Sequence, residues 1–307
     1  MADKLADFRK PEDAEAYYRL YDRILEEHWP TIAHEEIDIP GRFGTTRVRR
    51  TGYAEGTPIV MLHPTQGGSI GLTPFIGPLA QHHCVYTPDV IGTPGRSVQT
   101  APMQPPQDWV TWLDETLDAL GLDRVHLAGY SEGGYMALLN ASMTARPERL
   151  ATVTLLEPGG ALATMRTSSF VGMLIKMIPL MTARNAAKRK ERMREFSRWF
   201  NGDGYESTDD VLDLVPLAMT FRQTTGLPKK LSDDQLRRIT MPTHLMLGDS
   251  SRLFDAHKVA GRARRLLPEV TVDIRPGGHG FGYARPEEEM ARVLAFIADH
   301  ERGRVTR

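Results

Sequence analysis

The sequence predicts an α/β fold in which a mostly parallel central sheet is flanked by helices and interrupted by an inserted helical cap. Between residues 58 and 158, short, continuously apolar runs alternate with helix-length runs, as is typical of parallel strands buried on both faces. Between 159 and 240 this rhythm gives way to helical periodicity, and strand-like runs return afterwards. We therefore expect a core of residues 1–158 and 241–307, with a helical extension at 1–30 and a helical cap at 159–240.

Composition and charge limit the classes of protein and of partner that the sequence allows. A chain of 307 residues with 41% hydrophobic residues can bury a sizeable core. The formal net charge is −1 with both signs mixed, so we expect no nucleic-acid partner. Cys84 is the single cysteine, which excludes an intrachain disulfide and favours a reducing, cytoplasmic location. The first ten residues lack the apolar segment of a signal peptide, and no apolar run is long enough to span a bilayer, so we expect no membrane partner.

The N-terminal region predicts one helix and one antiparallel pair of strands. Residues 11–29 place apolar side chains on one helical face, and Pro30 ends the helix because proline cannot continue it. Strand-like stretches at 36–39 and 46–49 are separated by the turn-prone segment 40–44.

The rest of the core predicts strands that alternate with helices. Amphipathic helices are expected at 109–120 and 286–300. Apolar strand segments occur at 58–62, 84–89, 125–128, 151–156, 244–247 and 270–274.

The stretch that begins at Val125 carries the clearest chemical signal. An apolar strand leads into Gly129-Tyr-Ser131-Glu-Gly133, and a helix that opens on small residues follows. This is the nucleophile-elbow pattern, in which a sharp strand-to-helix turn lifts one serine hydroxyl clear of the sheet. Glycine is required because a Cβ at Gly129 or Gly133 would collide with nearby backbone. Ser131 is therefore the candidate nucleophile, and it needs a base within hydrogen-bond reach.

Four landmarks in chain order resemble the α/β-hydrolase superfamily over nearly the whole chain. They are His63-Pro-Thr, then Asp89 with Gly92 and Gly95-Arg-Ser97, then the Ser131 elbow, and last Gly277-Gly-His279-Gly-Phe. The N-terminal helix and the run Arg42-Phe-Gly-Thr-Thr-Arg-Val resemble the bacterial carboxylesterase-like branch, which has a helical cap. The resemblance implies the α/β-hydrolase fold, and it places the general base at His279 in its glycine-flanked loop.

The resemblance leaves the acid of the catalytic triad open. In most of the superfamily a carboxylate follows the strand at 244–247, but Ser251 occupies that position here. In some haloalkane dehalogenases the acid follows the preceding strand, which corresponds to Glu157 in this chain. A glutamate at the end of an apolar strand would be costly to bury without a partner, so we expect Glu157 to be the acid. Asp249 and Asp255 are the alternatives.

Two backbone N–H groups should stabilise the oxyanion. The resemblance assigns one to Glu132, directly after the nucleophile, and one to the loop after His63. Thr65 matches the second donor, with Gln66 as the alternative, because Pro64 has no N–H to donate. The side chain of Glu132 must point away from the oxyanion, since a carboxylate there would repel the developing charge.

The sequence therefore predicts a serine hydrolase that cleaves an ester, thioester or lactone of a small, apolar molecule, with no cofactor and no metal. Two alternatives stay open. The same residues could serve a cyclase or a carbon–carbon bond hydrolase, and Ser251 at the usual acid position leaves room for a non-catalytic ligand-binding relative.

Two features of the cap segment are expected to be structural or remain open. The basic run at 188–194 is interpreted as the solvated face of a cap helix rather than as a nucleic-acid or membrane site. Four methionines either line an adaptable apolar pocket or pack within the cap: Met165, Met173, Met177 and Met181.

Overall fold

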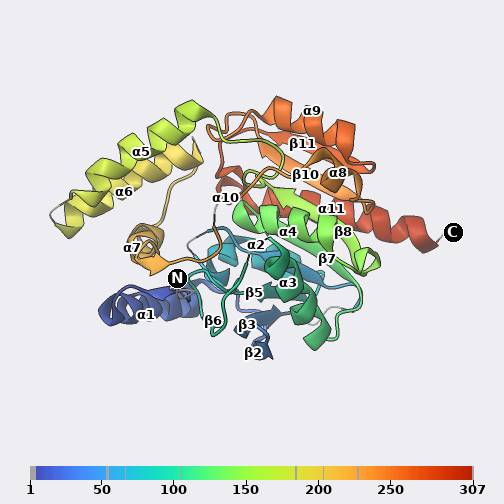
Figure 1. Cartoon of the computed structure of the whole chain (residues 1–307), viewed down its shortest axis with the longest axis horizontal. Coiled ribbons are helices and arrows are strands. Elements are labelled where there is room, and N and C mark those ends of the chain that lie inside the picture. The colour runs from blue at the N-terminus through green and yellow to red at the C-terminus, as the bar shows by residue number, and fades with distance from the viewer. Residues whose placement is uncertain are drawn as a thin grey trace.

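The computed structural model describes residues 5–52, 55–65, 67–104, 106–183, 185–202, 204–226 and 228–305. A nine-stranded sheet crosses the centre of the molecule, in the order β11-β10-β8-β7-β4-β5-β3-β2, with β6 paired to β3 (Figure 1). The strands of this sheet are β2 (His34–Gly41), β3 (Gly44–Thr51), β4 (Ile59–Leu62), β5 (Val85–Pro88), β6 (Val98–Gln99), β7 (Val125–Tyr130), β8 (Leu150–Leu156), β10 (Thr243–Gly248) and β11 (Val270–Arg275).

The sheet is parallel from β5 to β11 and antiparallel at its β2–β3 edge. Strand β4 pairs in parallel with β5 and β7, β7 with β8, β8 with β10, and β10 with β11. Strand β3 runs antiparallel to β2, β5 and β6. The predicted mostly parallel sheet is therefore confirmed, and so is the antiparallel pair of the N-terminal region.

Helices cover both faces of the sheet, as the continuously apolar strands require. Val60 and Leu62 of β4 pack against helices on one side of the sheet, whereas Ile59 and Met61 pack against helices on the other side. The helices of the core are α2 (Thr73–Ala80), α3 (Gln107–Ala119), α4 (Glu132–Met143), α9 (Ala256–Leu266), α10 (Phe281–Ala284) and α11 (Pro286–Val305), with short 3₁₀ turns at Ser69–Leu72 and Pro147–Arg149. Helix α11 thus runs five residues beyond its expected end.

The segment 159–240 contributes α5 (Thr167–Met181), α6 (Ala186–Asn201), α7 (Asp209–Ala218) and α8 (Asp233–Arg237). It also holds a strand that the sequence did not predict. β9 (Phe221–Arg222) pairs antiparallel with β1 (Asp7–Phe8) of the N-terminal extension. A two-residue strand has too short a pattern to be recognised. The extension helix α1 (Pro11–His28) packs on α7 through an aromatic and aliphatic cluster that includes Tyr17 and Leu214.

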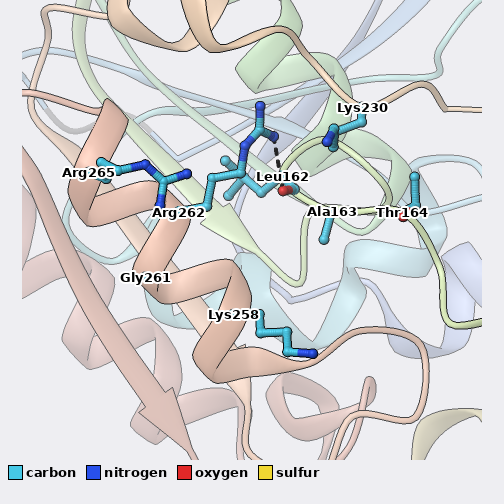
Figure 2. A pocket seen from close by; sticks show the side chains of 8 residues that line it. All are labelled: Leu162, Ala163, Thr164, Lys230, Lys258, Gly261, Arg262 and Arg265. Atoms are coloured by element: carbon cyan, nitrogen blue, oxygen red, sulfur yellow. Dashed lines mark hydrogen bonds between the residues drawn. The ribbon is translucent and has the colours of Figure 1, made fainter.

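Arg262 of α9 ties both ends of the segment 159–240 to the core. Its guanidinium donates to the carbonyl of Leu162 at 3.0 Å, as Figure 2 shows, and to the carbonyl of Leu231 at 2.7 Å. It also pairs with Asp233 at 2.6 Å. The surface hollow beside it, about 500 Å³, is lined by basic side chains of α9 and by Lys230, so it is separate from the serine elbow (Figure 2).

Candidate active site

Ser131 stands between the last residue of β7 and the first residue of α4, in a turn that only glycine neighbours permit. Its φ of 52° lies in the left-handed region, which non-glycine residues rarely adopt. A Cβ on Gly129 would lie 2.2 Å from the carbonyl oxygen of Gly133, and one on Gly133 would lie 2.1 Å from that of Leu62. The glycines are therefore required for this backbone path, and the path presents the Ser131 hydroxyl above the sheet.

His279 bridges Ser131 and Glu157. Its Nε2 lies 3.0 Å from Oγ of Ser131, and its Nδ1 lies 3.0 Å from Oε2 of Glu157. Because a carboxylate only accepts, Nδ1 carries the proton, and Nε2 is the acceptor for the serine hydroxyl. His279 and Glu157 are 3% and 2% exposed, so the contact between them is shielded from water.

Glu157 is held by two donors besides His279. The backbone N–H of Gly248 donates to its Oε1 at 2.7 Å, and the hydroxyl of Ser251 donates to its Oε2 at 3.0 Å. Glu157 itself has a φ of 46° as the chain leaves β8. The burial of this carboxylate is thus compensated by three hydrogen bonds, which meets the requirement stated for a buried glutamate.

The two alternative acids have other partners. Asp249 accepts from the backbone N–H of Gly277 at 3.0 Å and is exposed. Asp255 is the N-cap of α9, where the backbone N–H of Lys258 donates to it at 3.1 Å and holds the pKa of its carboxyl below the usual range. The structure brings Glu157, rather than Asp249 or Asp255, against the His279 ring.

The two expected oxyanion donors are linked by their side chains. The hydroxyl of Thr65 donates to Oε2 of Glu132 at 2.8 Å. Glu132 is 6% exposed, and its burial raises the pKa of its carboxyl, while the Thr65 hydrogen bond opposes that rise. The Glu132 carboxylate is thus held by the hydroxyl of Thr65. Gln66, the alternative donor, lies outside the described residues.

His63 braces this loop. The backbone N–H of Val90 donates to its Nε2 at 2.9 Å, and its Nδ1 donates to the carbonyl of Pro64 at 2.8 Å. Burial lowers the pKa of the His63 ring. The ring is therefore neutral, with one nitrogen accepting and one donating, and both are used in holding the loop.

Three contacts at the His279 loop were not predicted from the sequence. The hydroxyl of Tyr130 donates to the carbonyl of His279 at 2.5 Å. The ring of Phe200 meets the His279 ring edge-on at 4.9 Å between centroids, and the carbonyl of Asn201 accepts from the N–H of Gly280 at 2.9 Å. A contact from Tyr130 could have been predicted, because Tyr130 lies next to Ser131 in the sequence. No sequence pattern indicates that the C-terminal end of α6 contacts the His279 loop.

One group of residues within the described ranges has the spacing of metal ligands, and it lies away from the elbow. Glu27 and His28 of α1 approach Asp210 of α7 at the surface. The Arg23 guanidinium already pairs with Asp210 at 2.6 Å, so its positive charge opposes a cation at this position.

Comparison with known proteins places the chain in a family. The model of the alpha/beta hydrolase family matches residues 59–293. The carboxylesterase YbfK of Bacillus subtilis (strain 168) is 27% identical over 299 residues, which cover 94% of this chain and 96% of the relative. The uncharacterized carboxylesterase nap of the same organism is 24% identical over 290 residues, 92% of each chain.

Solved structures agree with this placement. The crystal structure of carboxylesterase CesB (YbfK) from Bacillus subtilis superposes with a TM-score of 0.82 at 24% identity, over 93% of this chain and 98% of that one. That likeness confirms the expected α/β-hydrolase fold. The protein belongs to the alpha/beta hydrolase family, and it is a hydrolase that resembles carboxylesterases.

Proposed function

We propose that the protein is a serine hydrolase that cleaves an ester, thioester or lactone of a small apolar molecule through an acyl-enzyme on Ser131. The observation that carries the proposal is the continuous hydrogen-bonded row from Ser131 through His279 to Glu157, which we call the triad. Residues 159–240 form the cap of this site. The cytoplasmic location expected from the single cysteine stays a prediction.

The triad supplies each proton movement that acyl transfer needs. As Oγ of Ser131 attacks the carbonyl carbon, its proton passes to Nε2 of His279, and the carbonyl oxygen becomes an oxyanion. The backbone N–H groups of Thr65 and Glu132 are the proposed donors to that oxyanion. Glu157 keeps the proton on Nδ1 and stabilises the imidazolium.

The tetrahedral intermediate then collapses by breaking the bond between the carbonyl carbon and the leaving group. The leaving oxygen or sulfur departs with the proton from Nε2, and Ser131 is left acylated. His279 next takes a proton from water, whose oxygen attacks the acyl carbon. Collapse of the second intermediate returns that proton to Oγ of Ser131 and releases the carboxylic acid, which closes the cycle with atoms and charges balanced.

Replacement of Ser131 by alanine tests the proposal. The Ser131→Ala variant should fold normally and lose turnover of a short-chain nitrophenyl ester, because the attacking oxygen is gone. Undiminished turnover by the folded variant would exclude the mechanism. A fluorophosphonate probe tests the non-catalytic alternative, because a relative without an activated serine would leave Ser131 unlabelled.

A further inference from the structure

Large apolar side chains are exposed almost exclusively on one helix of the described part of the chain. Seven such side chains are exposed, and six of them lie on α5 or directly before it. Those six are Met165, Phe170, Val171, Leu174, Ile175 and Ile178, with exposed fractions from 36% to 61%. The seventh, Val98, lies on β6. A group of large exposed apolar side chains close together on one helix is typical of an interaction site in a folded protein.

The exposed side chains form one stripe on α5, and the other side of the helix is already packed. Phe170, Leu174 and Ile178 follow one another at four-residue spacing, so they share a helical face. On the packed side, a Cβ on Gly172 would lie 2.6 Å from the Trp199 ring of α6. Leu180 is buried in a cluster with residues of α6 and α7. The stripe, formed by Phe170, Val171, Leu174, Ile175 and Ile178, therefore takes no part in the packing between α5 and α6.

The α5–α6 hairpin is also strongly basic. Residues 167–201 contain eight Lys or Arg and two Glu, a formal net charge of +6, whereas the whole chain carries −1. Acidic side chains of α7 pair with part of this charge, since Lys190 and Arg194 both contact Asp209. Lys188 and Arg189 are exposed in the first turn of α6, beside the loop that joins the two helices. Figure 1 shows the hairpin at the edge of the molecule, extending away from the sheet.

Charge decides which partner fits an apolar stripe on a basic hairpin. A second copy of this chain placed face to face on the stripe would bring two hairpins of +6 together, and like charges disfavour that contact. An anionic lipid surface satisfies both properties at once, because acyl chains accept the apolar side chains and headgroups attract Lys and Arg. Helix α5 has 15 residues, fewer than the roughly 20 apolar residues that a helix needs to span a bilayer.

We propose that the α5–α6 hairpin docks the protein on an anionic lipid surface, with the stripe from Phe170 to Ile178 inserted among the lipids. This replaces the expectation, drawn from sequence, that the basic run is only a solvated face. Within the described residues no helix is long and apolar enough to cross a membrane, so the contact is peripheral. The C-terminal end of α6 contacts the His279 loop through Phe200 and Asn201. If the proposed function holds, docking brings the triad next to lipid-dissolved esters.

Co-sedimentation of the full chain with vesicles tests the docking without any need for turnover. We expect binding to vesicles of phosphatidylcholine mixed with phosphatidylglycerol, weaker binding to phosphatidylcholine alone, and loss of binding as salt is added. The double variant Ile175→Glu with Ile178→Glu should lose at least about tenfold in affinity, because two inserted side chains become charged. The double variant Lys188→Gln with Arg189→Gln should bind several-fold more weakly.

Matched controls come from elsewhere on the surface. Val98→Glu changes the remaining exposed large apolar side chain, and Arg264→Gln with Arg265→Gln removes two charges from the exposed face of α9. Both controls should bind vesicles like the unaltered protein. Unchanged thermal melting and unchanged hydrolysis of a water-soluble ester would show that the α5 variants fold.

Three results would overturn the proposal. They are the absence of binding to anionic vesicles, equal binding by the Ile175→Glu/Ile178→Glu variant, and an equal loss in the controls. A dimer of the unaltered protein in light scattering, converted to monomer by the α5 variant and indifferent to vesicles, would assign the stripe to a second copy instead. Vesicle binding without esterase activity would leave the docking intact and refute the proposed function alone.

Discussion

Oε2 of Glu157, at the end of β8, lies 3.0 Å from Nδ1 of His279, while the loop after β10 supplies Ser251 to the same carboxylate. The loop in which the resemblance to the superfamily led us to look for an acid therefore carries a hydroxyl that donates to Glu157. Gly248, the last residue of β10, donates its backbone N–H to the other oxygen. Residues at the ends of the neighbouring strands β8 and β10 thus hold this buried carboxylate together.

Glu157→Gln should lower kcat/KM for a nitrophenyl ester by roughly 10³- to 10⁴-fold while the protein stays folded. The amide cannot stabilise the imidazolium, and its NH₂ group favours the tautomer with the proton on Nε2. Steady-state kinetics at neutral pH measures the effect. Asp249→Asn is the matched control, because Asp249 accepts from the backbone N–H of Gly277 and lies outside the triad, and it should cost less than about threefold. Equal losses in the two variants would contradict the role of Glu157.

Ser251→Ala should lower kcat/KM by about three- to tenfold, since Glu157 loses one of its three hydrogen bonds and keeps the other two. Ser251 is a positioning residue, so the decisive readout is rescue. Ser251→Thr retains the hydroxyl and should restore most of the rate, whereas Ser251→Val should behave like alanine or worse. A threonine variant as slow as the alanine variant would argue against this hydrogen bond.

Thr65→Val should act on both stability and rate. It leaves the buried Glu132 carboxylate without its hydroxyl donor, which should reduce the free energy of unfolding by about 1–3 kcal/mol. It also frees the backbone of Thr65 from the elbow, so kcat should fall about tenfold or more. Urea denaturation and steady-state kinetics measure the two effects. Thr65→Ser, which keeps the hydroxyl, should stay close to the unaltered protein in both, and a serine variant with the valine phenotype would refute the explanation.

His126 should make the protein less stable in mild acid. Burial lowers the pKa of this ring to about 4, even though Glu301 lies 3.2 Å from its Nε2. In the unfolded chain the ring has its ordinary value of 6.5. Between these two values the unfolded state binds more protons, so the free energy of unfolding falls as the pH drops from 6.5 to 4. Between pH 7 and 5 the loss should be about 2 kcal/mol.

Urea denaturation at pH 7 and at pH 5 measures that loss. His126→Gln should reduce the difference between the two pH values, although the buried rings of His63 and His244, whose pKa values burial also lowers, contribute in the same direction. A pH dependence unaltered by His126→Gln would show that this ring is not responsible.

The sheet could be predicted because most of its parallel strands are buried on both faces and are therefore largely apolar, as in β8, where all seven residues are buried. For the same reason, the sequence could predict that Glu157 has hydrogen-bond partners, since a carboxylate at the end of a buried apolar strand needs them. Its partner, His279, is 122 residues away in the chain, so their pairing was expected only from the resemblance to the α/β-hydrolase superfamily. The exposure of the apolar stripe of α5 could not be predicted from the sequence, because helical periodicity is the same whether an apolar face is covered or exposed.

Mass spectrometry of the intact protein tests the central claim most directly. After mixing with a slowly hydrolysed ester and rapid quenching in acid, the protein should gain the mass of one acyl group, and fragmentation should place that group on Ser131. The Ser131→Ala variant should gain none, and Glu157→Gln should acylate far more slowly. Turnover without any acyl adduct, or an adduct on a residue other than Ser131, would contradict the acyl-enzyme mechanism.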